Sequence, residues 1–190
     1  MKRIDITTFI TMLLEMKSCF QLKKNYCYFL SLFGKYLSKL VDVYAYCLMP
    51  NHFHLIIKVK SRNEILDFSN ENSDIDVPKI ISKQFSHFFN SYAQAYNKQQ
   101  NRKGSLFNNR YKRIEIISDE YLIKLIHYIH FNPVEANLCK KISDWRYSSY
   151  NSVLSEKETL LARDEVIKMF SDVNNFIYCH QIPPSISGIN

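Results

Sequence analysis

Glycine is scarce in this chain, with three among 190 residues. Gly34, Gly104 and Gly188 lie far apart, so no stretch forms one of the glycine-rich loops that cradle nucleotide phosphates. The sequence therefore excludes both the dinucleotide-binding motif and the P-loop. Any chemistry on a phosphate must come from other residues.

Paired cysteines and long apolar runs are missing as well. The five cysteines are odd in number and show no paired spacing, which favours a reducing, cytoplasmic environment over a disulfide framework. No apolar run approaches the roughly 18 residues of a membrane-spanning helix. We therefore expect a cytoplasmic protein with no membrane partner.

Acidic side chains are absent between residues 79 and 113, in a protein whose net charge is +7. Aromatic residues are interleaved with the bases of this stretch, a combination that suits phosphate contacts and base stacking on single-stranded nucleic acid. A solvated basic face is the ordinary alternative. Apart from Lys79, the bases are the candidate DNA-binding residues Lys83, Lys98, Arg102, Lys103, Arg110, Lys112 and Arg113.

Two histidines share one face of a strand that is predicted to follow the Pro50–Asn51 break. Residues 52–59 alternate, with His52 and His54 on one face and apolar side chains on the other. Their backbones should lie about 6–7 Å apart, so both imidazoles can converge on one metal ion. Zinc with Cys47 as a further ligand is one interpretation, and two ordinary surface histidines are another.

The hydrophobic patterns elsewhere in the sequence predict further helices and strands around this strand. Four segments have a clear pattern, helical over residues 22–40 and 79–99, and alternating over residues 41–47 and 112–117. Residues 61–78 should form a mobile loop, or a short helix followed by a loop. Ser118 is the expected N-cap of a further helix that Pro133 should end. Residues 1–20 have no clear pattern.

A second constellation lies on the helix that is predicted after Ser118. Tyr128 and Asn132 are four residues apart and therefore share one helical face. Alone, each would be an ordinary helical residue. Together with His52 and His54 they fit a single site, in which the histidines and Asn132 hold a divalent metal and Tyr128 lies one turn away. The roles of His127, His130 and His180 stay open, with packing or DNA contact favoured.

These motifs resemble the single-tyrosine HUH transposases, in particular the REP-associated tyrosine transposase branch of the insertion-sequence transposases. Residues 46–55, with the sequence YCLMPNHFHL, look like the family's HUH strand. Residues 128–134, with the sequence YIHFNPV, look like its tyrosine motif. The resemblance covers about residues 22–150. It divides the chain into an atypical N-terminal segment (1–20), a transposase domain (21–150), and a helical appendage with a loose tail (151–190). A short helix is expected near residues 164–170.

The resemblance implies a fold, a reaction and a partner. The fold would be a ferredoxin-like α/β fold of the HUH endonuclease type, an antiparallel sheet with helices packed on one face. His52, His54 and Asn132 would be ligands to Mg²⁺ or Mn²⁺, and Tyr128 the nucleophile. The reaction would be cleavage and rejoining of single-stranded or hairpin DNA through a 5′-phosphotyrosine, by a monomer or a homodimer.

The N-terminus departs from the family's pattern. Members of the family begin with a strand and an Asn-Arg-Gly-like turn, and residues 1–19 have neither in recognisable form. One hypothesis is that a reading-frame change close to the start of a decaying mobile-element copy has removed the first strand. The alternative function is a non-catalytic protein that binds single-stranded or hairpin nucleic acid, such as a decayed transposase copy. A zinc-stabilised structural domain that uses Cys47 is a third hypothesis.

Overall fold

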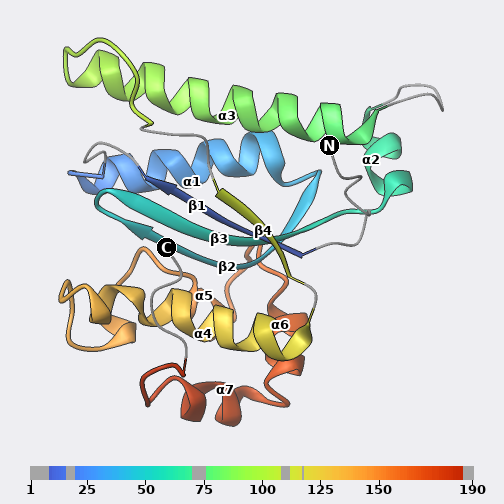
Figure 1. Cartoon of the computed structure of the whole chain (residues 1–190), viewed down its shortest axis with the longest axis vertical. Coiled ribbons are helices and arrows are strands. Elements are labelled where there is room, and N and C mark those ends of the chain that lie inside the picture. Colours follow the sequence, from blue (N-terminus) through green and yellow to red (C-terminus); the bar gives the residue numbers. More distant parts are fainter. Residues whose placement is uncertain (1–8, 16–19, 70–75, 108–111, 117, 186–190) are drawn as a thin grey trace.

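A computed structural model describes residues 9–15, 20–69, 76–107, 112–116 and 118–185. These residues form a four-stranded antiparallel sheet in the order β2-β3-β1-β4, between two helical layers (Figure 1). The strands are β1 (Phe9–Glu15), β2 (Val41–Met49), β3 (His52–Val59) and β4 (Lys112–Ile116). The helices are α1 (Lys23–Leu37), α2 (Arg62–Ser69), α3 (Val77–Gln99), α4 (Asp119–Glu135), α5 (Tyr150–Val153), α6 (Arg163–Met169) and α7 (Val173–Cys179), with a 3-10 turn η1 (Ile142–Asp144).

The succession of elements and the strand order are those of a ferredoxin-like fold, so the predicted fold class is confirmed. The helices α1 and α3 cover one face of the sheet, as expected (Figure 1). The expectation of helices on one face is incomplete, because α4 covers the other face together with the chain that follows it. Among the described helices, none combines the length and apolarity that crossing a membrane would require.

The alternation of β3 separates two hydrophobic clusters. Phe53 and Leu55 pack in the first cluster with α1 and α3. Ile56 packs in the second cluster with α4. An irregularity in β2 puts the consecutive residues Tyr44 and Ala45 into this second cluster, where strict alternation would separate them. The predicted strand therefore exists, but it is two residues longer and carries a bulge.

The hypothesis of a missing first strand is wrong. Strand β1 pairs with β3 along one edge and with β4 along the other, at the centre of the sheet. Its sequence, FITMLLE, is a nearly continuous apolar run. Such a run lacks the alternation that marks a half-exposed strand, and it is what a strand between two helical layers is expected to show.

The two ends of α4 have different signals. Ser118 Oγ accepts a hydrogen bond from the Tyr121 N–H, so the predicted N-cap is confirmed. The prediction that Pro133 ends the helix is wrong, because α4 continues to Glu135. It ends where Asn137 adopts a left-handed φ of 57°, and the Leu138 N–H then bonds the Pro133 carbonyl at 2.9 Å. Pro133 lacks a backbone N–H, but it lies in the last turn of α4, where the loss of one hydrogen bond does not stop the helix.

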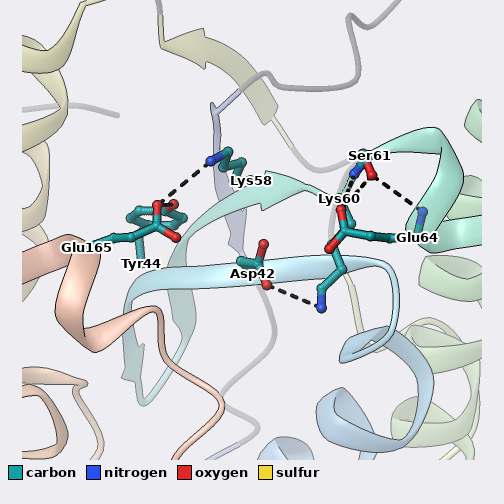
Figure 2. Close-up of polar contacts among 7 residues, drawn as sticks. All are labelled: Asp42, Tyr44, Lys58, Lys60, Ser61, Glu64 and Glu165. Carbon is teal, nitrogen blue, oxygen red and sulfur yellow. Dashed lines mark hydrogen bonds and ion pairs between the residues drawn. The ribbon is translucent and has the colours of Figure 1, made fainter.

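Polar contacts attach α6 to the sheet (Figure 2). The carboxylate of Glu165 on α6 accepts a hydrogen bond from the Tyr44 hydroxyl and lies 3.7 Å from Lys58 Nζ. Burial and this neighbouring carboxylate raise the pKa of the Tyr44 phenol. Asp42, two residues before Tyr44 on β2, forms an ion pair of 3.4 Å with Lys60, which follows β3.

The segment after residue 150 contributes to the second hydrophobic cluster. The short helix expected near residues 164–170 is present as α6, whereas α7 was not predicted. Val166, Phe170 and Phe176 from these helices are at most 3% exposed, in the cluster that also contains α4. Residues 61–78 contain α2, in line with the short-helix alternative. The domain boundary at residue 150 stays a prediction.

If this second cluster is an integral core, Phe176→Ala should lower the free energy of unfolding by about 3–5 kcal/mol, the usual cost of deleting a buried phenyl ring. Tyr178→Ala is the control, since that ring is 65% exposed on the same helix and should change stability by less than about 0.5 kcal/mol. Urea titration of both variants gives the comparison. Equal values would mean that α7 does not stabilise the fold.

Candidate active site

The two histidines of β3 lie beside the turn that joins β2 to β3. Their ring centroids are 5.1 Å apart and the rings are nearly perpendicular. His54 is 3% exposed, whereas His52 is half-buried. The His52 Nδ1–H donates to Asn51 Oδ1 at 2.9 Å, because a carbonyl oxygen can only accept. This leaves the lone pair of His52 on Nε2.

Helix α4 brings Tyr128 and Asn132 to the same place. The Asn132 Nδ2 group donates to His54 Nε2 and to the Tyr128 hydroxyl, both at 3.2 Å. The rings of His54 and Tyr128 meet edge to face with centroids 5.9 Å apart. Tyr128 and Asn132 are 3% and 7% exposed. Three side chains from two distant segments are therefore in direct contact, with His52 next to them.

His54 is held in its neutral form. Burial, followed by the repulsion of His52, lowers the pKa of His54 from 6.5 to about 3. Its Nε2 accepts a hydrogen bond from Asn132 and so carries the lone pair. A neutral imidazole with an available lone pair is the form that binds metals.

The donor set fits a divalent metal if the amide oxygen of Asn132 takes part. His52 and His54 each offer Nε2, and a half-turn of the Asn132 amide would replace Nδ2 with Oδ1 beside His54. Two imidazoles and a carbonyl oxygen are ligand types that divalent cations accept. In the described part of the chain, no three His, Cys, Asp or Glu side chains are arranged to hold a metal.

Cys47 is placed beside this site but is poorly suited to metal binding. It pairs with His54 across the β2–β3 ladder and is fully buried. Burial raises the pKa of the Cys47 thiol well above its ordinary value. Its Sγ lies 3.6 Å from Met49 Sδ, in an apolar environment. A zinc site needs a thiolate, which these surroundings disfavour.

The predicted DNA-binding lysines of α3 and of the turn after it do not join the tyrosine site. Lys83 and Lys98 are exposed on α3, and Lys103 is exposed in the following turn. Helix α3 covers the face of the sheet opposite to α4 (Figure 1). The sheet therefore lies between these bases and Tyr128.

The other predicted bases differ from one another. The Arg102 guanidinium donates to Asn97 Oδ1 at 2.7 Å and so fixes the turn after α3, a structural role that the sequence did not predict. Lys112 and Arg113 belong to β4, the edge strand beside β1. Arg110 lies outside the described residues.

A hydrogen-bonded chain behind Tyr128 was not predicted. His180 Nδ1–H donates to the Phe176 carbonyl at 2.7 Å, and His130 Nδ1–H donates to His180 Nε2 at 2.9 Å. His130 Nε2 then accepts from the Ser149 hydroxyl at 2.7 Å, and Ser149 Oγ accepts from the Tyr46 N–H. This direction is fixed because a carbonyl only accepts. Both histidines are neutral, and the chain joins β2, α4 and α7.

The two remaining histidines have simpler surroundings. His127 Nε2 is 3.0 Å from the carbonyl of Ile182, and its ring centroid is 4.8 Å from that of His180. His87 is exposed on α3. Packing against α7 therefore accounts for His127, as it does for His130.

The comparisons with known proteins show similarity at the level of structure. No protein-family model matches the chain, and no curated protein matches it. A solved structure of a REP-associated tyrosine transposase bound to a REP hairpin has 18% sequence identity and a TM-score of 0.56. The match covers 82% of this chain and 85% of that chain. This similarity supports the ferredoxin-like fold. In this chain, α4 and the segment after it add a second helical layer to that fold.

The neutral histidines should make the protein sensitive to acid. Burial lowers the pKa of His180 from 6.5 to about 3, although its bond to Phe176 opposes the shift. The unfolded chain therefore takes up a proton near pH 6.5 that the folded chain takes up only near pH 3. The stability linked to His180 is fully present above pH 6.5 and is lost as the pH falls towards 3.

Between pH 7 and pH 5 this one group should reduce the free energy of unfolding by about 2 kcal/mol. His180→Asn should be correspondingly less sensitive over that range, as measured by urea titration at the two pH values. His87→Asn, on the exposed face of α3, serves as the control and should behave like the unaltered protein. A parallel loss in all three proteins would assign the acid sensitivity to other groups.

Proposed function

We propose that this protein is a DNA strand transferase that cleaves and rejoins single-stranded or hairpin DNA, with Tyr128 as the nucleophile. The observation that carries the proposal is the contact of Tyr128, Asn132 and His54 beside His52, at one end of a ferredoxin-like sheet. A tyrosine hydroxyl next to potential metal ligands is an arrangement that supports nucleophilic attack on a phosphodiester, because a metal can activate both groups.

The reaction needs no nucleotide cofactor. The Tyr128 oxygen loses its proton and forms a bond to the phosphorus, and the bond from phosphorus to the 3′ oxygen breaks. The leaving oxygen takes up a proton and becomes a 3′-hydroxyl, while the 5′ end stays on the tyrosine. Attack by another 3′-hydroxyl reverses these steps and frees Tyr128. Because the phosphoester bond is conserved, rejoining requires no further energy source.

His52, His54 and Asn132 would hold the divalent metal, Mg²⁺ or Mn²⁺. Such an ion withdraws charge from the non-bridging phosphate oxygens and so makes an anionic diester a better electrophile. In this chain His54 is fixed in the neutral form by burial, and His52 keeps its Nε2 lone pair by donating through Nδ1. Asn132 Nδ2 donates to both His54 and the Tyr128 hydroxyl, and a half-turn of this amide would replace the donation to His54 by a metal bond through Oδ1.

A denaturing gel with labelled hairpin DNA and Mn²⁺ tests the nucleophile. The unaltered protein should give a covalent protein–DNA band, and Tyr128→Phe should reduce it at least about 100-fold, because the attacking oxygen is gone. Tyr121→Phe is the matched control, since Tyr121 lies two turns earlier on α4 and outside the site. It should leave the band unchanged.

Two other results would contradict the enzyme hypothesis. A band that persists in Tyr128→Phe would assign the attack to another group. Tight DNA binding by the folded protein with no band in any variant would instead establish the alternative, a non-catalytic protein that binds single-stranded or hairpin nucleic acid. The exposed lysines of α3 favour that alternative if chemistry is absent.

The metal site can be tested without DNA. Titration with Mn²⁺, followed by the loss of the paramagnetic signal of the free ion, should reveal one site in the unaltered protein. His54→Gln should weaken Mn²⁺ binding about 10-fold or more, because a ligand is replaced on a residue that Asn132 already orients. His87→Gln should have no effect. Equal affinities in all three proteins would place the metal elsewhere.

A further inference from the structure

The helical layer of α1 and α3 carries positive charge only. Helix α1 contains three lysines, helix α3 contains three more, and neither contains an aspartate or glutamate. The acids next along the chain, Asp42 and Asp76, lie beyond the end of α1 and at the start of α3. Helix α4, on the opposite face, begins with Asp119 and Glu120. The two faces of the molecule therefore differ in charge.

A groove lies between the first half of α1 and the second half of α3. Its volume is about 500 Å³, and its lining includes Lys24, Asn25, Tyr28, Tyr92 and Gln99. The Tyr28 ring is 44% exposed, and it lies 6.4 Å from the Tyr92 ring at an interplanar angle of 29°. Asn25 Nδ2 donates to Gln99 Oε1 at 2.8 Å and joins the two helices beside the groove. An accessible aromatic ring, two amide side chains and a lysine therefore lie together along this groove.

The groove is at the same end of the molecule as the tyrosine site, across the sheet. The Phe20 ring packs 5.7 Å from Tyr92, and the Phe20 N–H bonds the carbonyl of Pro50 at 3.3 Å. Pro50 belongs to the turn that leads directly to His52. In Figure 1 the end of α3, the β2–β3 turn and the end of α4 all lie on one side of the molecule.

We propose that this groove binds an unpaired nucleobase of the DNA, stacked on Tyr28, with the adjoining phosphates held by Lys24 and Lys98. The proposal rests on the proposed function and adds a second contact to it. An unpaired base offers a free ring face for stacking, which a base inside a duplex does not. Phosphates match a layer that has lysines and no carboxylates. The strand then passes the β2–β3 turn to reach Tyr128.

Fluorescence anisotropy with the full-length protein and a labelled oligothymidylate of twelve nucleotides tests the proposal. Tyr28→Ala should weaken binding between about 5-fold and about 100-fold, the range for losing one stacked base. Tyr178→Ala, which removes an exposed ring on α7, should not weaken it. Lys24→Ala should reduce the slope of log affinity against log salt by about 0.7, whereas Lys168→Ala should not.

Alkylation of Cys27 gives an independent measurement without substitution. This thiol is exposed and lines the groove, so bound oligothymidylate should protect it, while Cys179 on α7 should react as before. Unchanged reactivity of Cys27 at saturating oligonucleotide would overturn the proposal. So would equal weakening of binding by Tyr28→Ala and Tyr178→Ala.

The covalent-band assay separates this proposal from the proposed function. Tyr28→Ala should need a higher DNA concentration than the unaltered protein to form the band, because its defect is in binding, whereas Tyr178→Ala should form the band at the same concentration as the unaltered protein. Binding that depends on Tyr28, in a protein that never forms the band, would support the groove and overturn the strand-transferase function. A band in the unaltered protein with full affinity in Tyr28→Ala would overturn the groove alone.

Discussion

The packing of α4 against the histidine face of the sheet is the constraint on which the candidate site depends. Leu122, Leu125, Ile126 and Ile129 are at most 1% exposed in the cluster beneath this helix, and their burial fixes its rotation and height. Only at that height can Asn132 reach both His54 and Tyr128 at 3.2 Å. A slip of one helical turn would move the side chains by about 5.4 Å and break both contacts. The polar site is thus positioned by apolar contacts elsewhere on the same helix.

The chain after α4 holds that helix from its outer side. His130 lies two residues after Tyr128, and its ring is fully buried between Ser149 and His180. Because each nitrogen of these rings has a partner, leaving any member unpaired would cost the desolvation of a buried polar group. The α7 segment is therefore coupled to the position of Tyr128 through α4, although it contributes no residue to the site. The segment that contains α7 looks dispensable in the sequence, yet in the structure it helps to hold α4 in place.

The sequence predicted those features that depend on local patterns. The alternation of residues 52–59 and the four-residue spacing of Tyr128 and Asn132 were sufficient to group these residues, because a strand and a helix have fixed periods. Strand β1 escaped detection because its apolar run carries no period. The end of α4 was predicted at Pro133, the stronger local signal. The helix ends instead at the left-handed Asn137, a conformation that the residue type alone does not specify. The histidine chain joins residues 50 apart, and no local pattern reports such a contact.

The sheet itself explains why the bases and the tyrosine are on different faces. Alternation in β3 sends His54 towards α4 and Phe53 towards α1 and α3, so two layers built on the same strand face opposite ways. The β2–β3 turn, where the Phe20 N–H bonds the Pro50 carbonyl, offers a path around the sheet for a ligand that touches both layers. Bending a duplex sharply over so short a distance costs elastic energy, since its persistence length is about 50 nm. A single strand, or the unpaired end of a hairpin, can follow that path. If the proposed function holds, the separation of the lysines of α1 and α3 from Tyr128 therefore favours a flexible strand over a duplex as the substrate.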